Sequence, residues 1–352
     1  IVRHPLNQKA IRAAWEKVRG SGLFLRCKHI NGKTYIQADE SVKRHCRYLI
    51  IRKAIDRLIP NLPPFDAIFC LEDSFDDCSS DVPIFAFATR SLKENILLMP
   101  YPEALSKIDR SYISRVIQKA SAQYPWDKKE PKIFWRGTPT GVDQSTLLAS
   151  RRWTNPRHLL VQMSLENRSW LDAEFSLIYP NSPYKKELQG VLPVSSPVHP
   201  KDHLAFRYLI DIDGNSCCYS RTFWTLLSNS LVLKQVTKNR QWFYKDLKPY
   251  VHFVPIEENL SDIEEKYLWC LSHEKECETI RKNGSTFAAT HLSYEVSLRY
   301  FKSLLTAYAT WLQDPPTPED LDERDLVSCE LYWAWRLCKR GLKQTFSRRP
   351  IA

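Results

Sequence analysis

Short apolar runs alternate with longer amphipathic segments along most of the chain. In the first third, the runs FDAIFCLED (65–73) and VPIFAFAT (82–89) are typical of strands buried on both faces of a parallel sheet. A helical pattern extends over 39–58 until PNLPP stops it, and another helix is predicted at 111–123. Three shorter elements are predicted before these, namely a helix at 8–19 and strands at 23–26 and 34–36.

The same alternation resumes at IFW (133–135). Its clearest unit is 206–235, in which YLIDI predicts a strand, DGNS a turn, SRTFWTLLSN a helix and LVLKQ the next strand. YVHFVPI (250–256) predicts a further strand, and Ser261 with Glu264 three residues later forms a capping-box pattern that starts a helix. The last predicted elements are a helix at 286–312 and, after DPPTPED, the aromatic-rich helix ELYWAWRLCKR.

The polar segment YPWDKKEP separates two such series of strands and helices. Alternation on both sides of it predicts an α/β protein with two Rossmann-like domains that face each other across a cleft. We place the first domain at 1–125 and the second at 126–312. Residues 313–352 are predicted to form a helical tail that packs back on the first domain.

Composition indicates an anionic partner. The formal net charge is +11, which fits nucleic acid, an acidic membrane face or a nucleotide diphosphate. The basic residues are dispersed apart from the tail RLCKRGLKQTFSRRP, which favours an enzyme for phosphorylated substrates over a nucleic-acid-binding arm. No apolar run approaches the roughly 18–20 residues that span a bilayer, so no transmembrane segment is predicted.

The ten cysteines give no metal or disulfide framework. None forms a C-x-x-C pair, and the content is low for a disulfide scaffold of this length. Free buried thiols in a reducing compartment are the first interpretation, so we expect a cytoplasmic protein, either free or at the inner membrane face. The chain starts at Ile1 and not at methionine. The lumen of the ER or Golgi is therefore the alternative if a leader has been removed.

Charged residues lie at the carboxyl ends of several predicted strands. Glu72 and Asp73 end one strand, Arg136 ends IFW, and the loop 214–221 closes on Arg221. In open α/β sheets, ligands bind beyond these strand ends, so both arginines are expected to point into one cleft where a diphosphate neutralises them. The alternatives are a surface arginine beside an ordinary loop and an arginine that caps its own helix.

Several long motifs, taken in order, resemble the CAP10-like glycosyltransferases. They are CLEDSFDDCSSDVPIFAFAT, AQYPWDKKEPKIFWRGTPTG, YLIDIDGNSCCYSRTFWTLLSNSLVLKQ and QWFYKDLKPYVHFVPI, and the resemblance covers about 60–312. This family includes the animal protein O-glucosyltransferases and the fungal capsule xylosyltransferase-like proteins. The resemblance implies a GT-B architecture, a UDP-sugar donor, inversion at the anomeric carbon, and neither a metal nor another cofactor.

The resemblance also implies roles for individual residues. Asp73 stands where the family has its catalytic aspartate, and Arg136 and Arg221 stand where it holds the donor diphosphate. A positioned carboxylate is needed because an acceptor hydroxyl cannot lose its proton unaided at neutral pH, and fixed guanidinium groups stabilise the departing diphosphate. The other residues assigned to UDP-sugar binding are Gly137, Thr138, Thr140, Ser216, Tyr219 and Ser220.

Each assignment has an alternative. Asp73 could be a solvated acid in LEDSFDD, with Asp76 or Asp77 as the catalytic group. Ser216 and Ser220 also suit turn and N-cap positions. Asp211-Ile212-Asp213 matches the D-x-D metal signature of another glycosyltransferase fold, but Asp213-Gly214 is equally an ordinary turn signal, so no metal site is predicted.

Two departures from the family pattern concern donor and acceptor. Thr138-Pro139 replaces a second arginine that animal members carry after R-G, and the segment after LLMPYPEAL is shorter than theirs. We therefore expect an inverting, metal-independent transfer of glucose or xylose from a UDP-sugar. The acceptor hydroxyl is expected on a glycan, polysaccharide, lipid-linked sugar or protein serine, with no nucleic acid partner. The alternative is a non-catalytic carbohydrate- or polyanion-binding protein, including a nucleic-acid-binding one, on the same fold.

Overall fold

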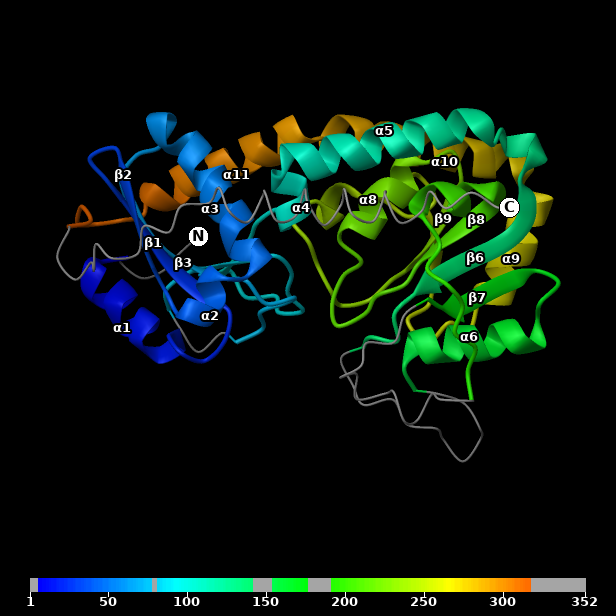
Figure 1. Ribbon diagram of the computed structural model, residues 1–352, viewed down its shortest axis with the longest axis horizontal. Coiled ribbons are helices and arrows are strands. Elements are labelled where there is room, and N and C mark those ends of the chain that lie inside the picture. The colour runs from blue at the N-terminus through cyan, green and yellow to red at the C-terminus, as the bar shows by residue number, and fades with distance from the viewer. Residues whose placement is uncertain (1–5, 78–80, 142–153, 177–190, 318–352) are drawn as a thin grey trace, which may run out of the picture.

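The computed structural model describes residues 6–77, 81–141, 154–176 and 191–317. Within these ranges two five-stranded sheets lie beside each other, with strand orders β2-β1-β3-β4-β5 and β10-β9-β8-β6-β7 (Figure 1). The two α/β domains predicted from the alternation of strands and helices are therefore confirmed. Because the first sheet contains an antiparallel part, only the second is a fully parallel Rossmann-like sheet.

The first sheet combines an antiparallel hairpin with parallel strands. Asn31 and Gly32 connect β1 to β2 with φ angles of 49° and 75°, a left-handed pair that suits a tight hairpin turn. β3 pairs antiparallel with β1 and parallel with β4, and β4 pairs parallel with β5. The strands are β1 (Phe24–Ile30), β2 (Lys33–Ala38), β3 (Phe65–Cys70), β4 (Ile84–Ala86) and β5 (Ile96–Leu98).

The second sheet is covered on both faces. Its apolar side chains divide into two clusters, one shared with α6, α9 and the first half of α10, and the other with α5, α8 and the second half of α10. The strands are β6 (Glu130–Gly137), β7 (Leu171–Phe175), β8 (Phe206–Asp211), β9 (Leu231–Gln235) and β10 (Val254–Ile256). The helices are α5 (Lys107–Gln123), α6 (Pro156–Glu166), α8 (Ser220–Leu227), α9 (Ile263–Ser272) and α10 (Glu274–His291).

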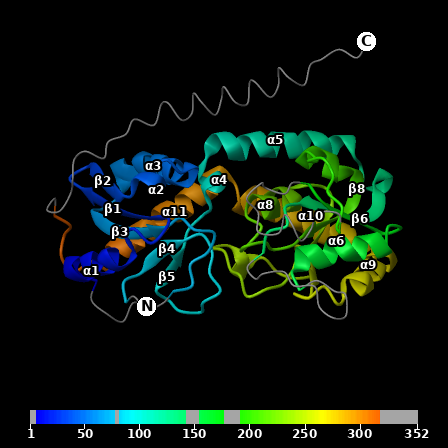
Figure 2. The same ribbon diagram turned by 60° about the horizontal axis from the view of Figure 1, so that its bottom comes forward.

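The remaining helices pack with the first sheet, and one comes from the far end of the chain. α11 (Tyr294–Ala309) buries Phe301, Leu305 and Tyr308 in the first core, and the Tyr308 hydroxyl donates to the Asp66 carbonyl at 2.7 Å. Figure 2 shows α11 beside β1 and β3 while α5 runs over the other half of the molecule. The others are α1 (Gln8–Val18), α2 (Glu40–Lys43), α3 (Cys46–Leu58) and α4 (Pro102–Leu105).

Each sheet thus packs with one helix whose sequence lies within the other predicted domain. α5 precedes the predicted boundary at 125 but packs on the second sheet, and α11 precedes the boundary at 312 but packs on the first. The boundaries themselves stay predictions, and the predicted tail beyond 317 lies outside the described residues. None of the helices in the described ranges has the length and apolar character that crossing a membrane requires.

Two helices predicted as continuous are each divided. The segment 39–58 forms α2 and α3, and 286–312 falls in α10 and α11. The second break has a local cause, since the Ser293 side chain accepts a hydrogen bond from the Val296 amide and so starts a new helix as its N-cap. This break lets α11 leave the second sheet and reach the first.

A backbone pair joins the two domains next to the strand ends. Thr89 and Arg240 exchange two amide–carbonyl hydrogen bonds of 3.1 and 2.8 Å. Asp76 supports this contact, because its Oδ1 accepts from the Thr89 hydroxyl at 2.8 Å and from the Arg90 amide at 2.5 Å. Asp76, the alternative base in the sequence, therefore holds a turn at the domain junction.

The first domain contains a buried ion pair whose loss we expect to be costly. Asp66 on β3 accepts from Arg26 Nε at 2.9 Å and Nη2 at 2.7 Å, and both side chains are almost fully buried. Changing Asp66 to Asn leaves the guanidinium without its counter-charge, so the free energy of unfolding should fall by about 3–5 kcal/mol. Urea denaturation measures this, with the half-exposed Asp56, 3.7 Å from Arg52, as the matched site where Asn should cost less than about 1 kcal/mol. Equal losses at the two sites would contradict the interpretation.

Candidate functional site

The carboxyl ends of β3 and β8 meet between the domains. Asp73 follows β3, and its side chain is about one third exposed. Asn215, in the loop after β8, donates from Nδ2 to Asp73 Oδ2 at 3.1 Å, and the Tyr219 hydroxyl donates to the Asp73 carbonyl. The structure therefore brings the predicted base into contact with the predicted donor loop, although these residues are more than 140 positions apart.

An arginine that the sequence did not single out also contacts Asp73. Arg47, in the first turn of α3, forms an ion pair with Asp73 Oδ1 and donates to the Leu71 carbonyl at 2.6 Å and to the Tyr101 hydroxyl at 3.2 Å. Burial lowers the pKa of Arg47, but Tyr101 and the Asp73 carboxylate together outweigh this and raise it above its ordinary value. The guanidinium is therefore charged at any physiological pH.

Two stacked tyrosines connect the domains beside Asp73. The rings of Tyr101 and Tyr219 are 4.0 Å apart at 17°, and Tyr219 adopts a left-handed φ of 50° as it precedes α8. Burial raises the pKa of both phenols well above the ordinary value. Both phenols are thus neutral: the Tyr101 hydroxyl accepts from Arg47, and the hydroxyl of Tyr219, a predicted donor-binding residue, donates to the backbone carbonyl of Asp73.

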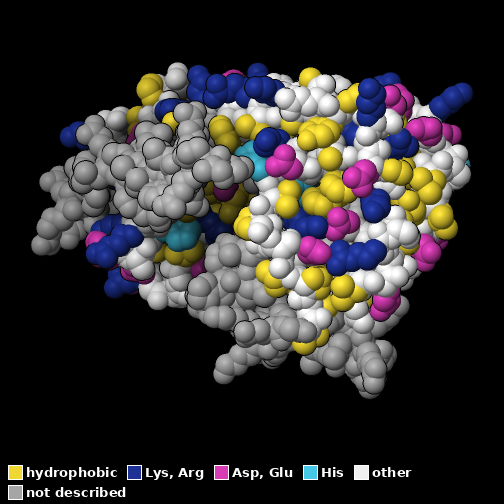
Figure 3. All heavy atoms as spheres, turned by 45° about the vertical axis from the view of Figure 1, so that its right-hand side comes forward, with side chains coloured by type: hydrophobic (Ala, Val, Ile, Leu, Met, Phe, Trp, Pro, Cys, Tyr) yellow, Lys and Arg dark blue, Asp and Glu magenta, His cyan; other side chains and the backbone are white. Residues whose placement is uncertain are grey.

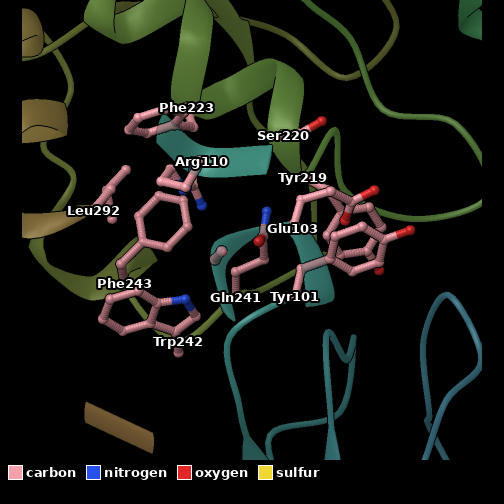
Figure 4. A pocket seen from close by; sticks show the side chains of 11 residues that line it. Tyr101, Glu103, Arg110, Tyr219, Ser220, Phe223, Gln241, Trp242, Phe243 and Leu292 are labelled. Carbon is pink, nitrogen blue, oxygen red and sulfur yellow. The ribbon is translucent and has the colours of Figure 1, made fainter. Parts of the chain in front are cut away.

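A pocket adjoins this tyrosine stack on the side away from the tyrosine hydroxyls (Figure 4). It includes Ser220, the first residue of α8. Burial lowers the pKa of its Arg110 to about 9 and raises the pKa of its Glu103. Its lining also includes Gln241 and Trp242 from the second domain.

Arg136 does lie at a strand end, but two carboxylates already hold its guanidinium. On the neighbouring β7, Asp172 Oδ1 is 2.8 Å and Glu174 Oε2 is 3.4 Å from Arg136 Nη2. The parallel register that pairs Arg136 with Glu174 produces this contact. Its carbonyl, in contrast, faces the loop after β8 and accepts from Arg221 Nη2 at 2.5 Å.

Arg221 reaches the end of β6 from the first turn of α8. Its guanidinium lies 5.9 Å from the ring of Trp135 and 5.5 Å from that of Trp224. Burial lowers the pKa of Arg221, and the positive Arg157 lowers it further. Among the described residues no carboxylate forms a salt bridge with it, so its charge is not neutralised there.

Arg157 is a second cation of the same kind, which the sequence analysis missed. It donates from Nε to the Asp213 carbonyl at 3.0 Å, from Nη2 to the Ile212 carbonyl at 3.1 Å, and from Nη1 to the Thr140 hydroxyl at 2.5 Å. It too has no carboxylate partner within the described ranges. The helix-start signal Asn155-Pro156 was available, since Asn155 caps α6 and puts Arg157 in its first turn.

Two glycines allow these loops to approach closely. A Cβ on Gly214 would lie 2.6 Å from the Thr140 hydroxyl oxygen and 2.8 Å from Arg157 Nη2, and one on Gly137 would lie 2.5 Å from the Trp135 ring. The hydroxyl oxygens of Thr138 and Thr140 are 3.4 Å apart. In the loop after β8, Ser216 is buried, and its carbonyl accepts from the Gly214 amide at 2.9 Å.

The two aspartates of the D-x-D sequence have structural partners. Asp211 is fully buried, accepts from the Thr222 hydroxyl at 2.7 Å and lies 3.4 Å from Lys234 Nζ. Asp213 Oδ2 accepts from Thr237 at 2.8 Å and from Asn239 at 2.9 Å. No group of three or more His, Cys, Asp or Glu side chains suited to a metal ion occurs in the part of the chain that the structure describes.

Comparisons with known proteins identify relatives of this chain. The sequence profile of glycosyl transferase family 90 matches residues 5–339. Rat protein O-glucosyltransferase 1 is 28% identical over 246 residues, which is 66% of this chain and 58% of the rat protein. Human protein O-glucosyltransferase 3 is 31% identical over 202 residues, covering 57% of this chain and 36% of the human protein.

A solved glycosyltransferase from Rickettsia africae shares 10% identity, covers 64% of this chain and 63% of its own, and has a TM-score of 0.37. This chain therefore spans less than two thirds of these relatives' lengths.

Proposed function

Because the chain belongs to glycosyl transferase family 90, we propose that it transfers a sugar from a UDP-sugar to an acceptor hydroxyl. The observation that carries the proposal is the meeting of Asp73 with the loop after β8 through Asn215 and Tyr219. This loop and α8 hold Arg221, whose positive charge no described carboxylate neutralises. A base on one domain thus faces a site for anions on the other.

In the proposed reaction, Asp73 is the base. It takes the proton of the acceptor hydroxyl as the hydroxyl oxygen bonds to the anomeric carbon on the face opposite the departing UDP, which inverts that carbon. The sugar passes through an oxocarbenium-like state as its bond to the diphosphate breaks. We propose that the step is metal-independent, with the positive charges of Arg221 and Arg157 acting on the leaving diphosphate in place of a divalent cation.

We assign the diphosphate to Arg221 and Arg157. Negative charge develops on the leaving UDP, and guanidinium groups already fixed by backbone carbonyls stabilise that charge without reorganising. Arg136 supports Arg221 through its carbonyl, and a diphosphate contact of its own stays a prediction. The donor side of the site is completed by Gly137, Thr138, Thr140, Ser216, Tyr219 and Ser220.

The donor sugar is proposed to be glucose or xylose. The names of the relatives, protein O-glucosyltransferases, support glucose and a protein hydroxyl, while glycan, polysaccharide and lipid-linked acceptors are retained. We place the reaction in the cytoplasm, free or at the inner membrane face, with the ER or Golgi lumen as the alternative. The seven cysteines in the described ranges are all free, which supports a reducing compartment.

A donor panel tests the proposal. UDP release is measured with UDP-glucose, UDP-xylose and UDP-galactose, and thermal unfolding is measured with UDP and with a short oligonucleotide. We expect UDP and one UDP-sugar to raise the melting temperature, because a ligand that binds only the folded state stabilises it. The same UDP-sugar should be turned over, and the oligonucleotide should have no such effect. Stabilisation by the oligonucleotide alone would support the polyanion-binding alternative and overturn the proposal.

A further inference from the structure

Arg47 joins three parts of the first domain at a single point. Its guanidinium contacts the Asp73 carboxylate, the Leu71 carbonyl at the end of β3 and the Tyr101 hydroxyl before α4. The same group lies 5.4 Å from the Tyr101 ring and 5.9 Å from the Phe87 ring. A planar fork held by these contacts has one orientation, so it transmits that orientation to the carboxylate.

The two oxygens of Asp73 consequently differ. Oδ1 is held by Arg47 from within the first domain, whereas Oδ2 is directed across the junction, where Asn215 of the second domain meets it. Asn215 is a neutral donor, and an incoming acceptor hydroxyl can take its place as another neutral donor. An acceptor hydroxyl cannot displace Arg47 in the same way, because the charge of Arg47 and its other two hydrogen bonds keep it beside Oδ1.

We propose that Arg47 is a positioning residue that fixes Oδ1 of Asp73 and so makes Oδ2 the oxygen that receives the acceptor proton. This inference rests on the proposed function. In the step, the acceptor O–H bond breaks and its proton moves to Oδ2, while the acceptor oxygen bonds to the anomeric carbon. The bond between the anomeric carbon and the diphosphate oxygen breaks, and its electron pair leaves with UDP. Afterwards the proton passes from Oδ2 to water, which restores the carboxylate.

Other titratable groups surround the carboxylate, but none replaces Arg47 as its counter-charge. Tyr101 and Tyr219 are neutral, because burial raises their pKa. Burial and then Arg47 lower the pKa of His45, so it is also neutral at physiological pH. Glu72 accepts from the Leu23 amide at 3.1 Å and contributes only negative charge. Arg47 is the cation that pairs with Asp73 in the described ranges.

The test compares Arg47→Gln and Arg47→Lys with Arg44→Gln, a matched change at an exposed position three residues away. We expect Arg47→Gln to lower kcat about tenfold to a hundredfold, because the base loses its orientation. The KM for the UDP-sugar should change less than threefold.

Lysine separates charge from orientation. Arg47→Lys keeps a cation without the planar fork, so kcat should still be reduced while the KM for the UDP-sugar changes little. Arg44→Gln should match the wild type in both kinetic constants. Wild-type kcat in Arg47→Lys would overturn the orienting role, even if Arg47→Gln fails to fold. In a folded Arg47→Gln, a rise in the KM for the UDP-sugar as large as the loss in kcat would indicate a general structural role and would overturn the proposal. Absence of transfer by the wild type would overturn the proposed function, and this inference with it.

Discussion

Asp73→Asn should lower kcat for sugar transfer by about 10²–10⁴-fold, the range that general-base catalysis contributes. An amide keeps the shape of the side chain and can still meet Asn215, but it cannot accept the acceptor proton. Affinity for UDP should stay within about twofold of wild type, because Asp73 lies on the first domain and the proposed diphosphate contacts lie on the second. Single-turnover kinetics and calorimetric titration with UDP measure the two quantities.

Asp76→Asn is the control for this experiment. Asp76 is in the same acidic cluster, but its Oδ1 holds the Thr89–Arg90 turn, and an asparagine oxygen accepts the same two hydrogen bonds. We expect kcat within about threefold of wild type. A large loss in Asp76→Asn with little loss in Asp73→Asn would assign the base to Asp76, the alternative that the sequence left open.

Arg221→Gln should have the second large effect. The side chain loses the charge that we assign to the diphosphate, so UDP affinity should fall about tenfold to a hundredfold, as expected for a hydrogen bond to a charged group. The loss in kcat/KM should be larger, about 10²–10³-fold, because negative charge on the leaving group increases in the transition state. Calorimetry with UDP and steady-state kinetics measure these changes.

Arg136→Gln provides the comparison, because its guanidinium already faces Asp172 and Glu174. Its removal leaves those carboxylates with Arg168 as their cation, so we expect a lower free energy of unfolding, by about 1–3 kcal/mol, and UDP affinity within about threefold. Similar losses of UDP affinity in Arg136→Gln and Arg221→Gln would instead indicate that Arg136 also binds the diphosphate, as the sequence predicted.

Much of the fold could be read from local patterns. The buried strands FDAIFCLED and LVLKQ and the turn-helix unit after YLIDI appear where apolar runs and turn residues predict them, because these signals depend on neighbouring residues. The helix boundaries were less predictable. The break at Ser293 depends on one side-chain cap, and the exchange of α5 and α11 between the two cores depends on packing between distant segments.

For the candidate site too, local sequence patterns predicted some of the residues, and only contacts between distant segments determined the others. Sequence motifs located Asp73 and the loop 214–221, since both follow predicted strands, but they gave no partner for either. Arg47 lies in a helix whose pattern indicates only an amphipathic surface, and nothing local marks it as a partner of Asp73. Arg136 was identified as a strand-end cation, yet the register with β7 decides that its charge is already paired.

The sequence by itself determined the alternation of strands and helices, the family resemblance and the residue types available at each strand end. Only the tertiary structure decided which charges are neutralised, that of Arg136 by two carboxylates and those of Arg157 and Arg221 by none that the structure describes. The reason is physical: strand propensity and capping act over a few residues, whereas electrostatic pairing depends on distances of a few ångströms between side chains that strand register and domain contact bring together.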